Sequence, residues 1–197
     1  LFLGGILSLI GYPDILKSGS SQLSIESLHM VPRLLMGILA MLDTFLIFKV
    51  AQRRYGVGVA LIASVLFAVM PMTWILRRVY LDTILMPLML TSILIALYLR
   101  PNDVAKTAES DNHKVSQGTL VVISGLFLGL AIYTKIPAFT MMPLVGSLVF
   151  FNSKKRFKSL GIWFIPVILI PLLWPLYSVV SDQTDLWIYW VLWQTGR

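Results

Sequence analysis

The chain has 197 residues, of which 57% are hydrophobic and 13% are charged, with a net charge of +7 at neutral pH. A soluble globular domain has about 45–50% apolar and about 25% charged residues, so this composition excludes water as the main solvent. The basic residues are scattered between apolar runs, which excludes a nucleic-acid surface. The sequence has no cysteine, which excludes disulfides, thiolate catalysis and Cys-ligated metal.

Long apolar runs separated by short polar segments predict an all-α, multi-pass transmembrane helical bundle. A bilayer core needs about 20 apolar residues per helix, and a helix satisfies its backbone hydrogen bonds internally. We expect a single domain with about six spans, at residues 33–51, 57–76, 82–99, 118–134, 138–151 and 160–180. The segments outside the spans are expected as a surface helix at 1–12, an outer polar loop at 13–32 and an interfacial aromatic tail at 181–197.

The apolar run over residues 118–151 is too long for one span. As a single helix it would measure about 50 Å, well beyond the hydrocarbon core. Pro137 disfavours helical geometry at Ile136. We therefore expect a turn at Lys135-Ile136-Pro137 that divides the run into two short spans.

Lysine and arginine placement predicts the orientation of the spans. The positive-inside rule places residues 53–54, 100–117 and 152–158 in the cytoplasm. Residues 13–32, 77–81 and 135–137 then face the opposite side. Basic residues on that disfavoured side are best tolerated where an anion needs them.

Three of these outer cations, Arg33, Arg78 and Lys135, lie at the ends of three different predicted spans. A bundle would bring them to one membrane face. Guanidinium groups bind phosphate oxygens in a bidentate manner, and an ammonium adds a point charge. We expect a lipid phosphate as their ligand, and snorkelling to headgroups is the alternative.

Two acidic residues lie within or at the edge of apolar runs. Asp82 follows Arg78 by four residues, so in a helix the two would share a face and pair. An acid in such a position is a functional-site hypothesis, with a structural ion pair as its rival. Asp43 lies near the middle of its span, where a bond to a neighbouring helix and a functional role are equally favoured.

Three segments carry a family resemblance, in this order: His29-Met30-Val31-Pro32-Arg33, Arg78-Val79-Tyr80-Leu81-Asp82, and the Gly-Leu-Ala-x-x-Thr-Lys pattern that ends at Lys135. Over roughly residues 1–150 the chain resembles the GT-C glycosyltransferases that use a polyprenyl-phosphate sugar. It is similar to the dolichyl-phosphate-mannose protein mannosyltransferases and their bacterial aminoarabinose-transferase relatives. The order and spacing of the segments carry the likeness, because each pattern alone has little specificity.

The resemblance implies an enzyme that transfers a mannose-like hexose or a related sugar from a polyprenyl or dolichyl phosphate. The acceptor would be a protein, lipid or glycan at the extracytoplasmic face. Arg78 and Lys135 would bind the donor phosphate, and Asp82 would orient Arg78 or touch the sugar as the catalytic residue of this chain. Arg33, Arg77 and Tyr80 would complete the substrate-binding set.

In that family the catalytic Asp and a His-Pro-Pro element precede the surface helix. We therefore expect the catalytic base upstream of Leu1, because Asp14 follows the predicted surface helix. Such transfer needs a base for the acceptor hydroxyl and cations for the departing phosphate, and the sequence supplies the cations.

The expected partners are the lipid bilayer, the lipid-linked sugar donor and the acceptor, with no nucleic acid. No cofactor or metal-ligand motif is evident in the sequence, although a divalent metal stays compatible with it. The plasma membrane of a prokaryote is favoured over the endoplasmic reticulum membrane. One alternative is a transporter or flippase with Asp43, Arg78 and Asp82 on its substrate pathway, and the lack of internal repeats disfavours it. Another alternative is a non-catalytic lipid-binding subunit.

Overall fold

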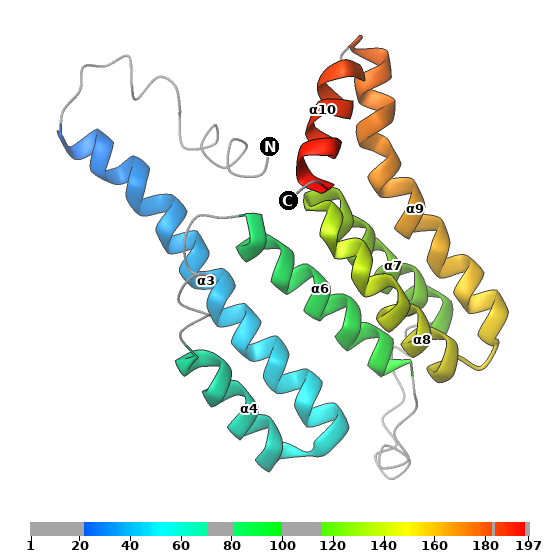
Figure 1. Cartoon of the computed structure of the whole chain (residues 1–197). Coiled ribbons are helices and arrows are strands. Elements are labelled where there is room, and N and C mark those ends of the chain that lie inside the picture. Colours follow the sequence, from blue (N-terminus) through cyan, green and yellow to red (C-terminus); the bar gives the residue numbers. More distant parts are fainter. Residues whose placement is uncertain (1–21, 71–80, 100–115, 183, 196–197) are drawn as a thin grey trace.

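The computed structural model describes residues 22–70, 81–99, 116–182 and 184–195, and of residues 22–29, 31, 81–82, 186–187, 190 and 193–195 it describes only the backbone. All regular elements in these ranges are helical (Figure 1). They are α3 (Gln22–Tyr55), α4 (Val57–Val69), α6 (Leu81–Tyr98), α7 (Gln117–Thr134), the 3-10 helix η2 (Ile136–Met141), α8 (Met142–Asn152), α9 (Arg156–Val180) and α10 (Thr184–Thr195). The expected helical bundle is confirmed for this part of the chain.

Four helices surround the hydrophobic core. α6 packs against both α7 and α8, and these two pack against α9, so the four close into a ring. Inside it lie the fully buried side chains Leu128, Val145, Val149 and Trp163. The α3–α4 hairpin lies on the outer side of α6, and α10 folds back along α9 (Figure 1).

Three helices are long and apolar enough to cross a membrane: Pro32–Tyr55, Gln117–Thr134 and Arg156–Val180. Three further apolar helices, Val57–Val69, Thr83–Tyr98 and Ile136–Asn152, are shorter. The outer surface of α4 and α9 is also apolar, with large side chains such as Leu66 and Leu169 more than half exposed. Such a surface suits contact with lipid chains rather than with water. The chain is therefore a helical protein suited to a membrane, and its six spans stay an expectation.

The expected outer loop at 13–32 is wrong from residue 22 onward, because α3 begins at Gln22. Polar residues favour a loop, yet residues 22–31 contain no glycine or proline to break a helix. Pro32 lies inside the helix, as proline often does in membrane helices. His29 and Arg33 therefore belong to one continuous helix rather than to a loop and a span.

Two glycines of α7 allow α9 to approach closely. A Cβ atom on Gly125 would lie 2.7 Å from the backbone oxygen of Trp163 and 2.7 Å from Cγ of Pro166. A Cβ atom on Gly129 would lie 2.6 Å from the backbone oxygen of Pro166. Small residues at such interfaces are how membrane helices gain van der Waals contact in the absence of a hydrophobic driving force.

Buried hydrogen bonds join α6 to its neighbours. The Ser92 hydroxyl donates to the carbonyl of Ser124 at 2.8 Å, and the Ser124 hydroxyl donates to the carbonyl of Ser92 at 3.1 Å. The amide of Asn152, at the end of α8, donates to the carbonyl of Ala96 at 3.1 Å. These bonds pin the register of α6 against α7 and α8, which fixes where the helix ends meet.

Candidate functional site

Lys135 occupies the break between α7 and η2. The residue is extended, with φ −154° and ψ 121°, so the α-helix stops there. Its backbone N–H still donates to the carbonyl of Ala131 at 3.0 Å, and its carbonyl accepts from the N–H of Ala138 at 3.0 Å. Pro137 lies at the start of η2, at the break that the sequence predicts. The half-buried lysine is thereby held in a defined turn at one end of the helical ring.

An apolar groove of about 330 Å³ lies beside this turn, and we call it the turn groove. It is formed by the end of α7, η2, the start of α8, the proline-containing half of α9 and one residue of α10. Its lining residues are Ile132, Tyr133, Ile136, Phe139, Met142, Val167, Ile168, Pro171, Leu172, Trp174, Pro175 and Val191. Tyr133 and Ile136, on either side of Thr134 and Lys135 in the sequence, belong to this lining, so the cation lies in the same turn as the edge of the groove.

The prolines of α9 shape the wall of the turn groove. Pro171 and Pro175 line the groove and have no backbone N–H, so the carbonyls of Val167 and Pro171 lack the usual donor four residues later. The helix continues through both positions. The groove wall is therefore formed by apolar side chains on a helix that lacks two of its usual backbone hydrogen bonds.

The other predicted site residues are placed less completely. Arg33 is exposed on α3. Asp82 is the second residue of α6, and the structure describes its backbone only. Arg77, Arg78 and Tyr80 lie outside the described residues.

Helix direction still relates these residues to one another. α3 and α6 run in the same direction and α7 runs opposite to them, so the start of α6 and the end of α7 lie at the same end of the ring (Figure 1). Asp82, the second residue of α6, and Lys135, the first residue after α7, both belong to that end. Arg33 lies on α3, and α6 separates that helix from α7 and Lys135 (Figure 1). The expected outer face is thus consistent with the helix directions, although no contact among the predicted site residues is described.

Sequence reasoning missed the turn groove, because its lining comes from segments up to about sixty residues apart that only packing brings together. A usable signal was present in the prolines at 166, 171 and 175, which mark an unusual helix face within an apolar run. Asp43 was identified from sequence, and it is 3% exposed with no hydrogen-bond partner for Oδ1.

The described residues contain no group of three or more His, Asp or Glu side chains that could hold a metal ion. Comparisons of the chain with protein-family models, with curated proteins and with solved structures find no match. The functional assignment therefore depends on the geometry of the chain and on the sequence patterns.

Proposed function

We propose that the chain is a membrane glycosyltransferase, or the major membrane part of one, that uses a polyprenyl-phosphate sugar as donor. One observation carries this proposal: the apolar turn groove lies directly beside the turn that holds Lys135. A polyprenyl phosphate combines a long branched apolar chain with a compact anion. The groove matches the first of these parts in chemistry and the lysine matches the second.

The size of the groove favours partial enclosure of the donor. Binding sites for small molecules span about 300–1,000 Å³, so the turn groove at about 330 Å³ would hold the phosphate-proximal part of the chain. The rest of the isoprenoid would stay among the bilayer lipids. Phe139 and Trp174 would contact the chain, and the ammonium of Lys135 would contact the phosphate.

The proposed reaction forms a bond between the acceptor oxygen and the anomeric carbon of the sugar, and it breaks the bond between that carbon and the phosphate oxygen. A base takes the proton of the acceptor hydroxyl, and the leaving polyprenyl phosphate gains negative charge. Lys135 and Arg78 would stabilise that charge, and Asp82 would lie beside Arg78. Arg77 and Arg33 would add positive potential. Tyr80 would contact the donor or the acceptor. The start of α6 lies at the same end of the ring as Lys135, which supports this grouping (Figure 1).

A binding measurement tests the proposal without relying on turnover. Lys135→Met keeps most of the length of the side chain and removes its charge. It should weaken binding of polyprenyl-phosphate mannose about ten- to hundredfold, as expected for a hydrogen bond to a charged group. Binding of the uncharged polyprenyl alcohol should not change. Lys158→Met, at an exposed lysine on α9, is the matched control and should bind both lipids normally. Unchanged phosphate-lipid affinity in Lys135→Met would contradict the proposal.

Asp43 supports one rival function. A carboxyl that is 3% exposed within an apolar helix, with no hydrogen-bond partner at Oδ1, is a recurring feature of proton and ion pathways. A transporter of this kind would move protons across liposomes under an imposed pH gradient, and Asp43→Asn would abolish the flux. The exposed Asp182→Asn should leave it unchanged. No Asp43-dependent flux is expected if the chain is a glycosyltransferase.

A further inference from the structure

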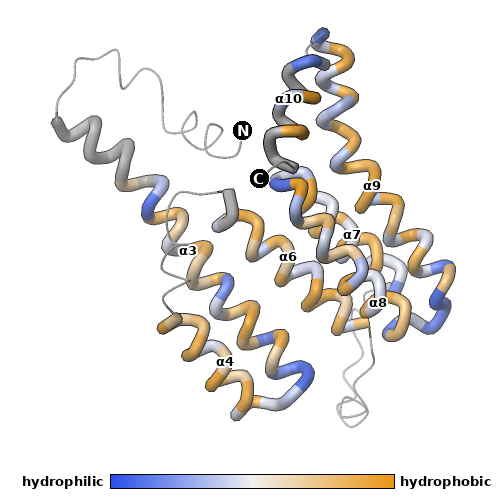
Figure 2. Tube along the Cα trace, viewed as in Figure 1, coloured by the Kyte–Doolittle hydropathy of each residue, from blue (hydrophilic) through white to orange (hydrophobic). Residues whose placement is uncertain are grey.

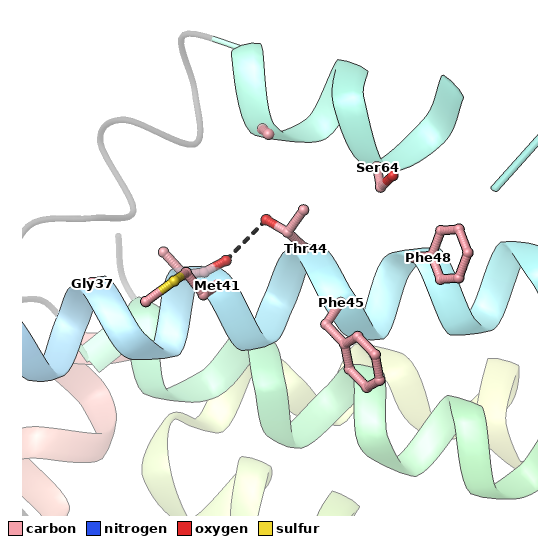
Figure 3. A pocket seen from close by; sticks show the side chains of 8 residues that line it. Gly37, Met41, Thr44, Phe45, Phe48 and Ser64 are labelled. Atoms are coloured by element: carbon pink, nitrogen blue, oxygen red, sulfur yellow. Dashed lines mark hydrogen bonds between the residues drawn. The ribbon is translucent and has the colours of Figure 1, made fainter. Parts of the chain in front are cut away.

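A second groove lies between α3 and α4. The two helices touch near their connecting turn, where Ala60 is fully buried, and they leave a groove of about 560 Å³ that is open on one side. α3 contributes Gly37, Met41 and Phe48 to its lining, and α4 contributes Ser64 and Ala68 (Figure 3). We call this the α3–α4 groove.

The hydroxyl groups in the α3–α4 groove are already engaged. The Thr44 hydroxyl donates to the carbonyl of Ala40 at 3.0 Å (Figure 3). The Ser64 hydroxyl donates to the carbonyl of Leu61 at 3.0 Å. Each bond stays within its own helix. The groove therefore offers an occupant mainly carbon surface, which suits an alkyl chain better than a polar ligand.

A cation is held over the same aromatic rings that line the groove. The ammonium of Lys49 lies 5.5 Å from the ring centroid of Phe45 and 5.9 Å from that of Phe48. It also donates to the side-chain oxygen of Gln52 at 3.3 Å. Phe45 and Phe48 both line the α3–α4 groove, so the charge of Lys49 is adjacent to the apolar lining.

Two arginines continue the positive charge to the end of α3. Arg53 and Arg54 lie in its last turn, and the guanidinium of Arg53 lies 4.6 Å from the ring centroid of Tyr98 on α6. This end of α3 lies at the same end of the molecule as the basic turn between α8 and α9 (Figure 2). The positive-inside rule assigns such an end to the cytoplasmic leaflet, which is rich in anionic lipids.

We propose that the α3–α4 groove binds an anionic glycerophospholipid of the cytoplasmic leaflet. One acyl chain would lie along the groove, and the headgroup phosphate would contact Lys49, Arg53 and Arg54. Charge complementarity selects this occupant, because an apolar groove with cations at one end matches an amphiphile with an anion at one end. An apolar partner helix would fill the groove but would not need the cations at its end. The site lies at the end of the molecule opposite to Lys135, so it does not depend on the glycosyltransferase proposal.

Lipid selectivity of the full chain tests the headgroup contact. The chain would be reconstituted in nanodiscs with phosphatidylglycerol and phosphatidylcholine in equal amounts, and the retained lipid would be counted by native mass spectrometry. Lys49→Gln should lower the preference for phosphatidylglycerol about fivefold, as expected for one cation near an anionic surface, and adding R53Q and R54Q should abolish it. The triple variant K154Q/K155Q/K158Q removes three exposed lysines at the same end and should keep the preference. Equal losses in the two triple variants would overturn the proposal.

A groove-filling variant tests the acyl-chain contact. Ala68→Phe adds a ring inside the α3–α4 groove and leaves every charge in place, so it should lower the number of retained lipids. Leu66→Phe, on an exposed position of α4 outside the groove lining, is its control and should retain the wild-type number. Unchanged lipid retention in Ala68→Phe would overturn the proposal. So would a dimer of the chain that Ala68→Phe disrupts with no change in lipid retention, because the occupant would then be a second copy.

Discussion

The glycines of α7 determine how close α9 can approach it. In Gly125→Ala the new methyl group would meet the backbone oxygen of Trp163 at 2.7 Å, and a backbone atom cannot move aside without shifting α9. We expect a loss of about 1–3 kcal/mol in unfolding free energy, the usual cost of overpacking. Thermal unfolding in detergent measures it.

Gly161→Ala is the matched control, because nothing lies within 4 Å of the position of its new methyl group. Alanine at this position inside α9 should stabilise the protein by about 0.5–1 kcal/mol relative to glycine. Equal stability of the two variants would show that α7 and α9 are not in close contact.

A second prediction at the scale of single residues concerns Arg78 and Asp82, which are four positions apart in the sequence. If the two side chains act as one unit at the donor phosphate, Arg78→Gln and Asp82→Asn should each remove most sugar transfer by the complete enzyme in membranes. The double variant should be little worse than either single one, because residues that act as a unit are strongly non-additive.

A purely structural ion pair predicts a different pattern for the same variants. Either single change would leave an unpaired charge in a low-dielectric environment and lower stability by about 3–5 kcal/mol, while the double change would be milder. Protein abundance would then fall in the single variants and recover in the double variant. Abundance and activity measured together separate the two outcomes.

At the scale of elements, the connection from α3 to α4 depends on one glycine. Gly56 has φ 91° and ψ 175°, a backbone conformation that is essentially restricted to glycine. Gly56→Ala should therefore destabilise the hairpin by about 1–3 kcal/mol. The readout is faster tryptic cleavage at Arg53 and Arg54.

Gly58→Ala provides the comparison for that turn. Gly58 lies in the first turn of α4 with nothing within 4 Å of the added methyl group, so cleavage should stay at the wild-type rate or become slower. Faster cleavage in both variants would mean that the turn conformation is not the cause.

The sequence predicts the breaks between helices better than their beginnings. Pro137 restricts the backbone at Ile136, and Gly56 allows a backbone conformation that ends a helix, so the ends of α7 and α3 lie close to the predicted positions. The start of α3 differs from the predicted one, because polar residues favour a loop but a polar sequence without glycine or proline can remain helical. The proline and the glycine therefore indicate where these two helices end, whereas polarity alone does not indicate where α3 begins.

Helix pairing could not be predicted in the same way. The bonds between Ser92 and Ser124 join residues that are 32 positions apart, and either serine alone is an ordinary residue in an apolar run. The turn groove depends on that pairing as well, because α7 and α9 must pack before their side chains can line a common wall. The sequence supplied the cation at Lys135, and only the packed bundle supplied the apolar surface beside it.

At the scale of the whole molecule, charge is distributed unequally between the two ends of the bundle. The basic turns after α3 and after α8 lie at one end, and the Lys135 turn lies at the other (Figure 2). Because the chain has no cysteine, Lys155→Cys and Thr140→Cys each introduce a single reactive site. Position 140 should react with an impermeant maleimide added outside intact cells, and position 155 should react only after permeabilisation. External labelling of position 155 would contradict the proposed orientation.

The most direct measurement for the central claim is photo-crosslinking with a polyprenyl-phosphate sugar that carries a diazirine on an isoprene unit near the phosphate. The account predicts labelling of peptides from η2 and α9, around Phe139 and Leu172, which both line the turn groove. An excess of unlabelled polyprenyl phosphate should compete for this labelling, and Lys135→Met should reduce it. Labelling that is spread over α3 and α4, or that neither the competitor nor Lys135→Met affects, would contradict a donor site at this turn.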